Sequence, residues 1–242
     1  MSSLFYNLGK MAGPKIRKAK WIWQSMTGSE TDTIKTENEV GRDLACEIRH
    51  QAELDHDPNI KQILNKTGLH LAECVANRSR TFSFEIIKDT EPNAFALPGG
   101  FIFVTNSMVE LCGRDRDELA FIIGHEMAHV IRGHAIKRII SESALNVASR
   151  TTPIRGQISG WLRKAGIQIL ENAYSQELES QADKLGVRLT DAAGYNPNAS
   201  IQLLRRLAGR NSSESQSVLG SYFSSHPPLE ERIRNINQQL LK

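Results

Sequence analysis

The stretch from His125 to His129 reads His-Glu-Met-Ala-His, and these residue types can hold a metal ion and act on a water bound to it. His125 and His129 are four residues apart, about one turn of α-helix, so both imidazoles leave a helix on the same face and can bind one metal ion. Glu126 then lies beside the metal-bound water, from which a carboxylate can take a proton. Chance gives this motif in roughly two of a hundred chains of this composition, so the surrounding sequence has to support it.

The residues around the motif have the pattern of a buried helix. The Asp115 side chain can cap the first turn, and the Glu118 side chain, three residues later, can accept a hydrogen bond from the backbone N–H of Asp115 in return. Apolar residues then recur with helical spacing and form a stripe that faces the core: Leu119, Ile122, Ile123, Val130 and Ile131. Two histidines with this spacing on a buried helix indicate a metal site.

A catalytic zinc site has three protein ligands and one position for water, so a third ligand must lie elsewhere in the chain. His134 is the next histidine, but it lies about 140° around a continuous helix from His129, and we interpret it as a polar residue at the helix end. Glu179 is the better candidate, because Asp183 follows one helical turn later and can accept the outer N–H of a zinc-bound histidine. On its own, such a carboxylate pair is more typical of a solvated helix face.

The composition is that of one soluble globular domain. The 242 residues are 40% apolar and 24% charged, with a net charge of +3, which excludes a disordered chain, a collagen or a coiled coil as a global description. No stretch approaches the roughly 20 uncharged apolar residues that cross a bilayer. Basic residues are spread along the chain, so we expect no nucleic-acid partner.

Hydrophobic periodicity predicts an α+β fold that is mostly helical. Helices are expected at residues 31–55 and 59–77, because apolar residues recur there every three or four positions. Alternating apolar residues predict strands at 82–86 and within 94–105, the latter folded around a Pro-Gly-Gly turn. We therefore expect a small antiparallel sheet beside the helix of the His-Glu-x-x-His motif, and only helices after residue 115.

Residues 1–30 are predicted to be an arm in front of a single domain at 31–242. The first twenty residues contain five lysine and arginine residues and no acidic residue, and the basic residues lie among apolar side chains. The arm either packs against the body or touches an anionic membrane surface through residues 1–26. It lacks the apolar region of a signal peptide, and the three cysteines have neither an even number nor a ligand spacing. We therefore expect reduced core cysteines and a cytoplasmic location, with any membrane contact peripheral.

Four segments occur in the order found in the gluzincin metallopeptidases of the HtpX, Oma and Ste type, which the sequence resembles from about Asp57 to its C-terminus. They are Asn93–Gly100 (NAFALPGG), His125–His129 (HEMAH), Glu179–Asp183 (ESQAD) and Ser225–Pro228 (SHPP). Four segments in order are far more specific than one motif. The resemblance implies a zincin-like metallopeptidase domain.

The same resemblance implies a role for individual residues. It implies one Zn²⁺ per chain, bound by three side chains: His125, His129 and Glu179. Glu126 would be the general base and later the proton donor, and Asp183 would orient a zinc-bound histidine. The strand at Asn93 and Ala94 would border the cleft and pair with an extended protein or peptide substrate.

Two assignments stay open. The resemblance places His226 near the zinc, where it either donates a hydrogen bond to the developing oxyanion, the role that we favour, or occupies the open metal position and keeps the enzyme latent. A third interpretation puts His226 at a helix start without contact to the metal. Residues 136–172 are rich in apolar side chains and form a lid over the cleft, a membrane-touching hairpin or ordinarily packed helices.

The sequence thus favours a zinc-dependent metalloendopeptidase that hydrolyses protein substrates and acts in protein quality control. The alternative is a zinc-stabilised chaperone or adaptor that binds unfolded chains without cutting them. Glu126 disfavours this alternative, because a structural zinc needs no adjacent base and usually has four protein ligands. The residues define neither the physiological substrate nor the oligomeric state.

Overall fold

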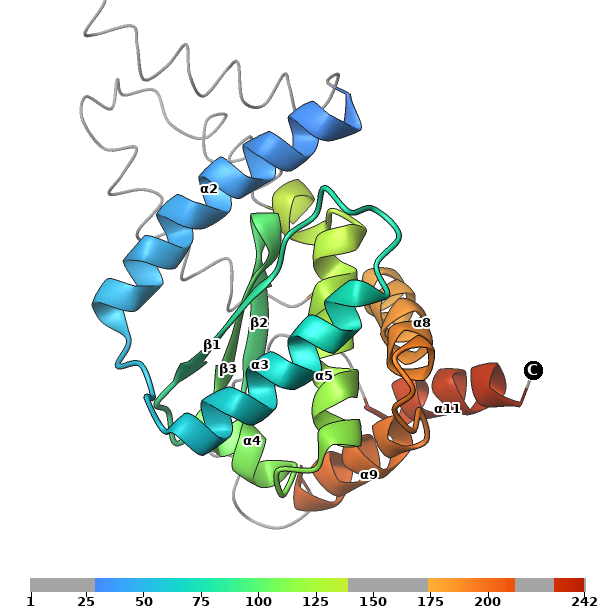
Figure 1. Ribbon diagram of the computed structural model, residues 1–242. Coiled ribbons are helices and arrows are strands. Elements are labelled where there is room, and N and C mark those ends of the chain that lie inside the picture. Colours follow the sequence, from blue (N-terminus) through green and yellow to red (C-terminus); the bar gives the residue numbers. More distant parts are fainter. Residues whose placement is uncertain (1–28, 139–173, 212–228, 242) are drawn as a thin grey trace, which may run out of the picture.

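The computed structural model describes residues 29–138, 174–211 and 229–241 (Figure 1). Within this part of the chain helices predominate and the strands form one small sheet, so the predicted α+β class is confirmed. Three of the predictions lie wholly or almost wholly outside the described residues: the arm at residues 1–30, His226, and the segment 136–172.

Helices α2 (Glu30–Gln51) and α3 (Pro58–Glu73) precede the sheet in the chain. The Ser29 side chain caps α2 by accepting a hydrogen bond from a backbone N–H, and Asp57 caps α3 in the same way. Both helices begin within one residue of the predicted start. They end earlier than predicted, because Ala52 is extended and Cys74 begins a turn.

The sheet has three strands, β1 (Ser83–Ile87), β2 (Ala94–Leu97) and β3 (Phe101–Thr105), in the order β1-β3-β2. Strands β2 and β3 form the predicted antiparallel hairpin around the short helix η1 (Pro98–Gly100). Strand β1 instead runs parallel to β3. The chain passes from β1 to the far edge of the sheet and returns through the hairpin to its centre, which makes the sheet mixed rather than wholly antiparallel.

Successive side chains of a strand point to opposite faces of a sheet. Both faces of this sheet are covered by helices. On one face, Leu97 and Phe103 pack against α2. On the other face, Phe84 and Ile102 belong to the main core, which includes residues of α3 and of the motif helix.

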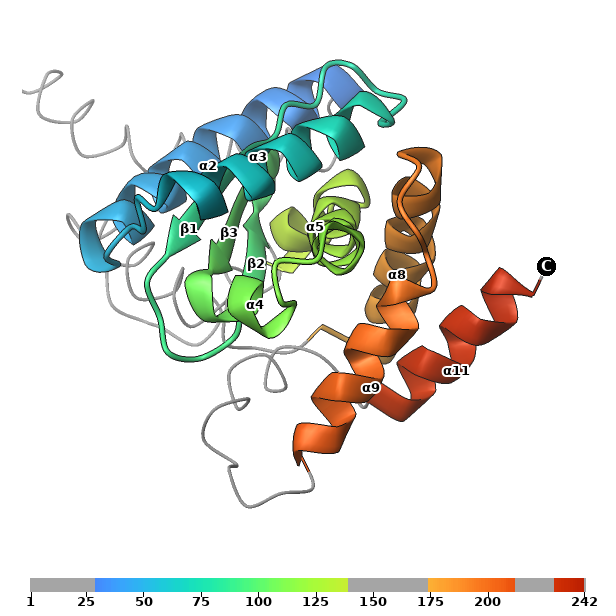
Figure 2. The same cartoon turned by 60° about the horizontal axis from the view of Figure 1, so that its bottom comes forward.

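The motif helix, α5 (Arg116–Ile131), lies at the centre of the molecule. Every residue from 118 to 130 is buried, so the helix is packed on all sides rather than along the one predicted stripe. Figures 1 and 2 show α5 between the sheet and α8 (Gln176–Ala192). The other helices within the described residues are α4 (Asn106–Leu111), α9 (Ala199–Asn211) and α11 (Leu229–Leu240).

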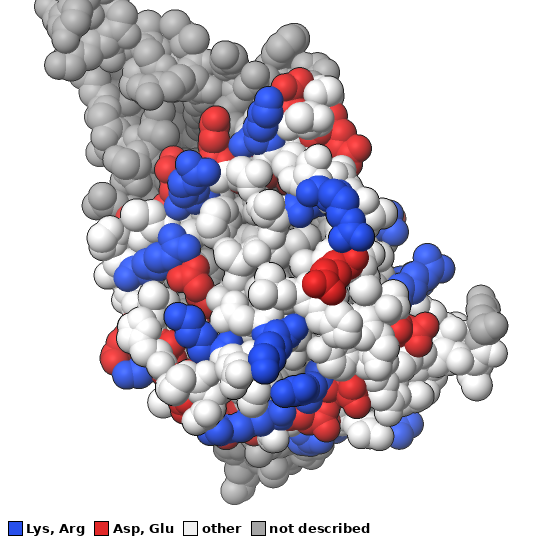
Figure 3. Space-filling model, in the orientation of Figure 1, with Lys and Arg blue, Asp and Glu red and all other residues white. Residues whose placement is uncertain are grey.

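The surface carries charges of both signs. On the face shown in Figure 3, the side chains of Lys and Arg are interspersed with those of Asp and Glu. Within the described ranges, no helix has the length and apolar character needed to cross a membrane.

The three cysteines are free, as predicted, but they lie in different environments. Cys112 is buried and Cys74 is half-buried. Cys46 is exposed, so the prediction of a core position is wrong there. It lies on α2 next to the buried Ala45, but its own side chain is exposed.

Candidate metal centre

Asp115 begins the helix that carries the motif. Its carboxylate accepts hydrogen bonds from the backbone N–H groups of Asp117 and Glu118, at 2.8 and 3.2 Å. Glu118 does not complete the reciprocal cap that the sequence predicted. Its two oxygens accept hydrogen bonds from the Arg206 guanidinium of α9, at 2.6 and 2.8 Å. This pair holds the start of α5 against α9.

Two glycines allow α8 to approach α5 closely. A Cβ at Gly186 would lie 2.9 Å from the backbone nitrogen of His125, and one at Gly124 would lie 3.1 Å from the carbonyl oxygen of Gly186. Any side chain at Gly186 would therefore push the two backbones apart. The close contact brings Glu179 and Asp183 of α8 beside the motif histidines.

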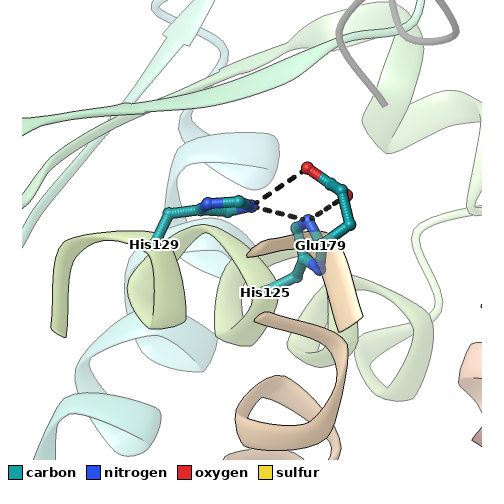
Figure 4. A group of neighbouring side chains, drawn as sticks. All are labelled: His125, His129 and Glu179. Carbon is teal, nitrogen blue, oxygen red and sulfur yellow. Dashed lines mark hydrogen bonds and ion pairs between the residues drawn. The ribbon is translucent and has the colours of Figure 1, made fainter. Parts of the chain in front are cut away.

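Figure 4 shows the three predicted ligands converging from α5 and α8. The Nε2 atoms of His125 and His129 are 3.1 Å apart, and each lies 3.4 Å from a different oxygen of Glu179. The three side chains are buried, and their ligand atoms all lie within 4.8 Å of one another. A tetrahedral zinc ion with bonds of about 2.0–2.1 Å separates its ligand atoms by about 3.3 Å. The two imidazoles and the carboxylate thus have the chemistry and the spacing of three zinc ligands.

Asp183 lies on the outer nitrogen of His125, where the sequence predicted it. Its Oδ1 is 2.9 Å from His125 Nδ1. Arg232 of α11 donates to the same carboxylate twice, from Nε at 2.9 Å and from Nη2 at 2.7 Å. Burial alone would raise the pKa of Asp183, but the charge of Arg232 and the contact with His125 hold it well below its ordinary value. An ionised Asp183 keeps the His125 proton on Nδ1 and leaves Nε2 for a metal.

Arg232 was not predicted to belong to the site. It is buried, although arginine side chains are mostly exposed. Its position in the sequence does carry a signal, because it lies three residues after Leu229 and four before Ile236, which are both buried on α11. A charged residue on the buried stripe of a helix indicates a paired, functional position.

Glu126 is buried next to the three converging side chains. Burial, assisted by the charge of Glu179, raises the pKa of Glu126 to about 7 against the opposing effect of His125. Its carboxylate can therefore take up a proton near neutral pH, as the predicted general base must.

His134 is not the polar helix end that the sequence analysis proposed. The residue is buried, and its Nδ1 lies 3.0 Å from Nδ1 of His129. Because α5 ends at Ile131 and Gly133 has a φ of 68°, a turn interrupts the helix before His134, and the angle calculated for a continuous helix does not apply. Burial lowers the pKa of His134 to about 4, so the ring is neutral at neutral pH.

Tyr174 covers the face of the His129 ring. The two ring centroids are 4.0 Å apart with an interplanar angle of 19°. The Arg138 guanidinium lies 3.3 Å from the centroid of the Tyr174 ring. The His129 imidazole is thus contacted on its face by Tyr174 and at its Nδ1 atom by His134.

Asn93 directly precedes β2 and Ala94 begins it, at an edge of the sheet. The Asn93 carbonyl accepts a hydrogen bond from the backbone N–H of Thr105, whereas the N–H of Ala94 donates to the Asn93 side chain, both at 2.9 Å. Because backbone groups of an antiparallel strand alternate between its two edges, the N–H groups of Ala94 and Ala96 point away from β3. Among the described strands, β2 pairs with β3 alone.

A buried helix with the His-Glu-x-x-His motif, a glutamate from a later helix and a small adjoining sheet are the features of a gluzincin-type metallopeptidase. Residues 58–240 match the family described as Peptidase family M48. The chain belongs to this family.

Several named proteins are similar to the chain. The mitochondrial metalloendopeptidase OMA1 of Schizosaccharomyces pombe is 30% identical over 163 residues, which are 66% of this chain and 47% of that protein. The beta-barrel assembly-enhancing protease of Escherichia coli O157:H7 is 24% identical over 221 residues, or 86% of this chain and 44% of that protein. The metalloprotease YcaL of Escherichia coli K12 is 23% identical over 199 residues, 78% and 76% of the two chains. The chain thus spans about half the length of the first two relatives.

Proposed function

We propose that this chain is a zinc-dependent endopeptidase that hydrolyses peptide bonds in protein substrates. His125, His129 and Glu179 would hold the Zn²⁺. The bound ion supplies Lewis-acid chemistry, because it lowers the pKa of a bound water to about 7 and polarises the scissile carbonyl. The proposal depends on three buried ligand atoms within 4.8 Å of one another, two of them from the helix of Glu126 and the third from Glu179 of α8.

Glu126 moves the protons of the reaction. It follows His125 directly on α5, and its side chain is buried. The carboxylate takes a proton from the attacking water and returns it to the leaving amine. Asp183 and Arg232 keep the His125 ring in one orientation while this happens.

The outer edge of β2 binds the substrate backbone. An extended peptide adds to this edge as a further strand and forms hydrogen bonds with the outward groups of Ala94 and Ala96. The N–H of Ala94 donates to the Asn93 side chain at 2.9 Å, so a peptide carbonyl takes the place of that side chain. Because these hydrogen bonds involve only the peptide backbone, the edge can bind peptides of many different sequences.

A role in protein quality control follows from this mode of binding. Unfolded and unassembled proteins expose extended segments, and an edge that reads the backbone binds them irrespective of sequence. The name of one bacterial relative describes an enhancer of β-barrel assembly, while the name of the yeast relative places that protein in mitochondria. The cytoplasmic location, with peripheral membrane contact through residues 1–26, stays a prediction for this chain.

A chaperone or adaptor without catalytic activity fits the site less well. A structural zinc usually has four protein ligands, whereas a catalytic zinc has three and keeps a position for water. Among the described residues, the candidate cluster consists of three side chains. A purely structural site needs no general base, whereas this cluster has the buried carboxylate of Glu126 beside it.

Substitution of the third ligand tests the proposal. We expect the wild-type protein to hold one zinc per chain after dialysis, and Glu179→Gln to lose most of it together with hydrolysis of casein. Glu230→Gln is the matched control, because it makes the same change at an exposed position of α11. Full zinc occupancy in Glu179→Gln, with a thermal melt like that of the wild type, would show that the third ligand lies elsewhere.

A further inference from the structure

The outer nitrogen of His129 faces a second histidine rather than a carboxylate. Nδ1 of His129 lies 3.0 Å from Nδ1 of His134. The side chain of His134 also interacts with that of Gln181, two residues before Asp183 on α8. Gln181 in turn donates its amide N–H to Glu177 at 3.4 Å. A line of side chains therefore leads from the metal centre to the exposed face of α8.

The direction of these hydrogen bonds follows from a proton count. As a ligand, His129 presents the lone pair of Nε2, the atom that lies 3.4 Å from Glu179, so its single proton is on Nδ1. This proton needs an acceptor, and Nδ1 of His134 can accept it only when the His134 proton is on Nε2. The side-chain carbonyl of Gln181 is an acceptor suited to that Nε2–H.

We propose that His134 is a positioning residue of the metal centre, which accepts the Nδ1–H of His129, is anchored by Gln181, and so fixes the tautomer and orientation in which His129 binds zinc. This inference rests on the proposed function, because it takes His129 as a ligand. Each group in the line donates outward, which increases the electron density that Nε2 of His129 offers to the metal. The centre thus has two unlike supports, ionised Asp183 behind His125 and neutral His134 behind His129.

The turn that follows α5 makes the contact possible. On a continuous helix, residue 134 would lie about 140° around the axis and about 7.5 Å along it from residue 129. Gly133 instead adopts a left-handed φ of 68°, and a new helical segment starts at His134. His134 is 1% exposed, so bulk water does not replace its ring as the partner of His129.

Zinc affinity of matched variants tests the proposal. His134→Phe keeps a ring of similar size without a nitrogen, and we expect it to weaken zinc binding about 10- to 100-fold. His134→Asn keeps an acceptor near the position of Nδ1 and is expected to restore most of the affinity. His70→Phe, at an exposed position of α3, should bind zinc like the wild type. Gln181→Met should also weaken binding, whereas Gln202→Met on the exposed face of α9 should not.

Nitrogen NMR of the His129 ring adds a readout that depends neither on activity nor on metal. We expect the His129 proton on Nδ1 in the wild type and a mixture of both tautomers in His134→Phe. Equal zinc affinity of His134→Phe and His134→Asn would overturn the proposal, because the acceptor would then have no effect. An unchanged His129 tautomer in His134→Phe would overturn it as well. A wild-type protein that binds no zinc would refute the proposed function, and the tautomer in the zinc-free protein would still decide the role of His134.

Discussion

Arg232 and Asp183 form a buried ion pair behind the metal centre. Their side chains are both 3% exposed, and the shorter of their two hydrogen bonds is 2.7 Å. Removal of one partner from such a pair leaves a buried charge uncompensated, which costs about 3–5 kcal/mol. Arg232 therefore stabilises the fold and the orientation of His125 together.

We expect Arg232→Leu to lower the free energy of unfolding by about 3–5 kcal/mol and to weaken zinc binding roughly 10- to 100-fold. Arg232→Lys should lie between this variant and the wild type, because lysine keeps the charge but cannot bind both carboxylate oxygens in the same way. Urea unfolding and zinc titration measure the two effects. Arg234→Leu, at an exposed position of the same helix, is the control. Wild-type stability in Arg232→Leu would contradict the pairing.

Local spacing alone predicts only the His-Glu-x-x-His part of the site, whose residues lie within about one helical turn. Glu179 and Asp183 were assigned to the site because the sequence resembles a known metallopeptidase family. Arg232 and His134 were not assigned to the site, because their contacts arise from non-local packing and backbone conformation. Arg232 depends on how α11 packs against α8, and His134 depends on the left-handed φ of Gly133.

At the scale of elements, the distance between α5 and α8 sets the spacing of the ligands. A Cβ at Gly186 would lie 2.9 Å from the His125 backbone nitrogen. We therefore expect Gly186→Ala to lower the free energy of unfolding by about 1–3 kcal/mol and to weaken zinc binding. Thermal unfolding and zinc titration measure this, with Lys184→Ala at an exposed position of α8 as the control. Wild-type zinc affinity in Gly186→Ala would show that the ligand spacing tolerates a wider separation.

A proline in β2 is expected to have a different effect at the edge that faces β3 than at the outer edge. Proline at Ala96 removes an N–H that points away from β3, whereas proline at Phe95 removes one that points toward it. Ala96→Pro should therefore raise KM for peptide substrates with little change in the melting temperature, and Phe95→Pro should lower the melting temperature. Cleavage kinetics and thermal melts on the same samples separate the two effects. An unchanged KM in Ala96→Pro would remove β2 from the substrate site.

The helices and the hairpin were predicted from local periodicity. The structure differs from the predicted fold where an element's position depends on contacts with residues far away in the sequence. The parallel pairing of β1 with β3 has no local signal, because β2 lies between them in the chain and at the far edge of the sheet. The motif helix was expected to bury one stripe. It is buried on all sides because α8 packs against it as well as the sheet and α3.

For the whole molecule, the position of α5 joins the two parts of the proposed active site. The helix lies between the sheet and α8 (Figures 1 and 2), so its motif can meet a ligand from α8 while β2 lies on its other side. The arm at 1–30, the role of residues 136–172 as a lid, a membrane-touching hairpin or packed helices, and the role of His226 stay predictions, because nearly all of these residues lie outside the described ranges.

Glu126 is proposed to move the protons of peptide hydrolysis beside a zinc ion held by His125, His129 and Glu179. The most direct measurement compares the wild type with Glu126→Gln, recording casein cleavage and zinc content on the same samples. We predict equal zinc content and equal thermal melts, with a rate that is lower by roughly 10²- to 10⁴-fold in Glu126→Gln. A Glu126→Gln protein that holds its zinc and cleaves casein at the wild-type rate would contradict the claim.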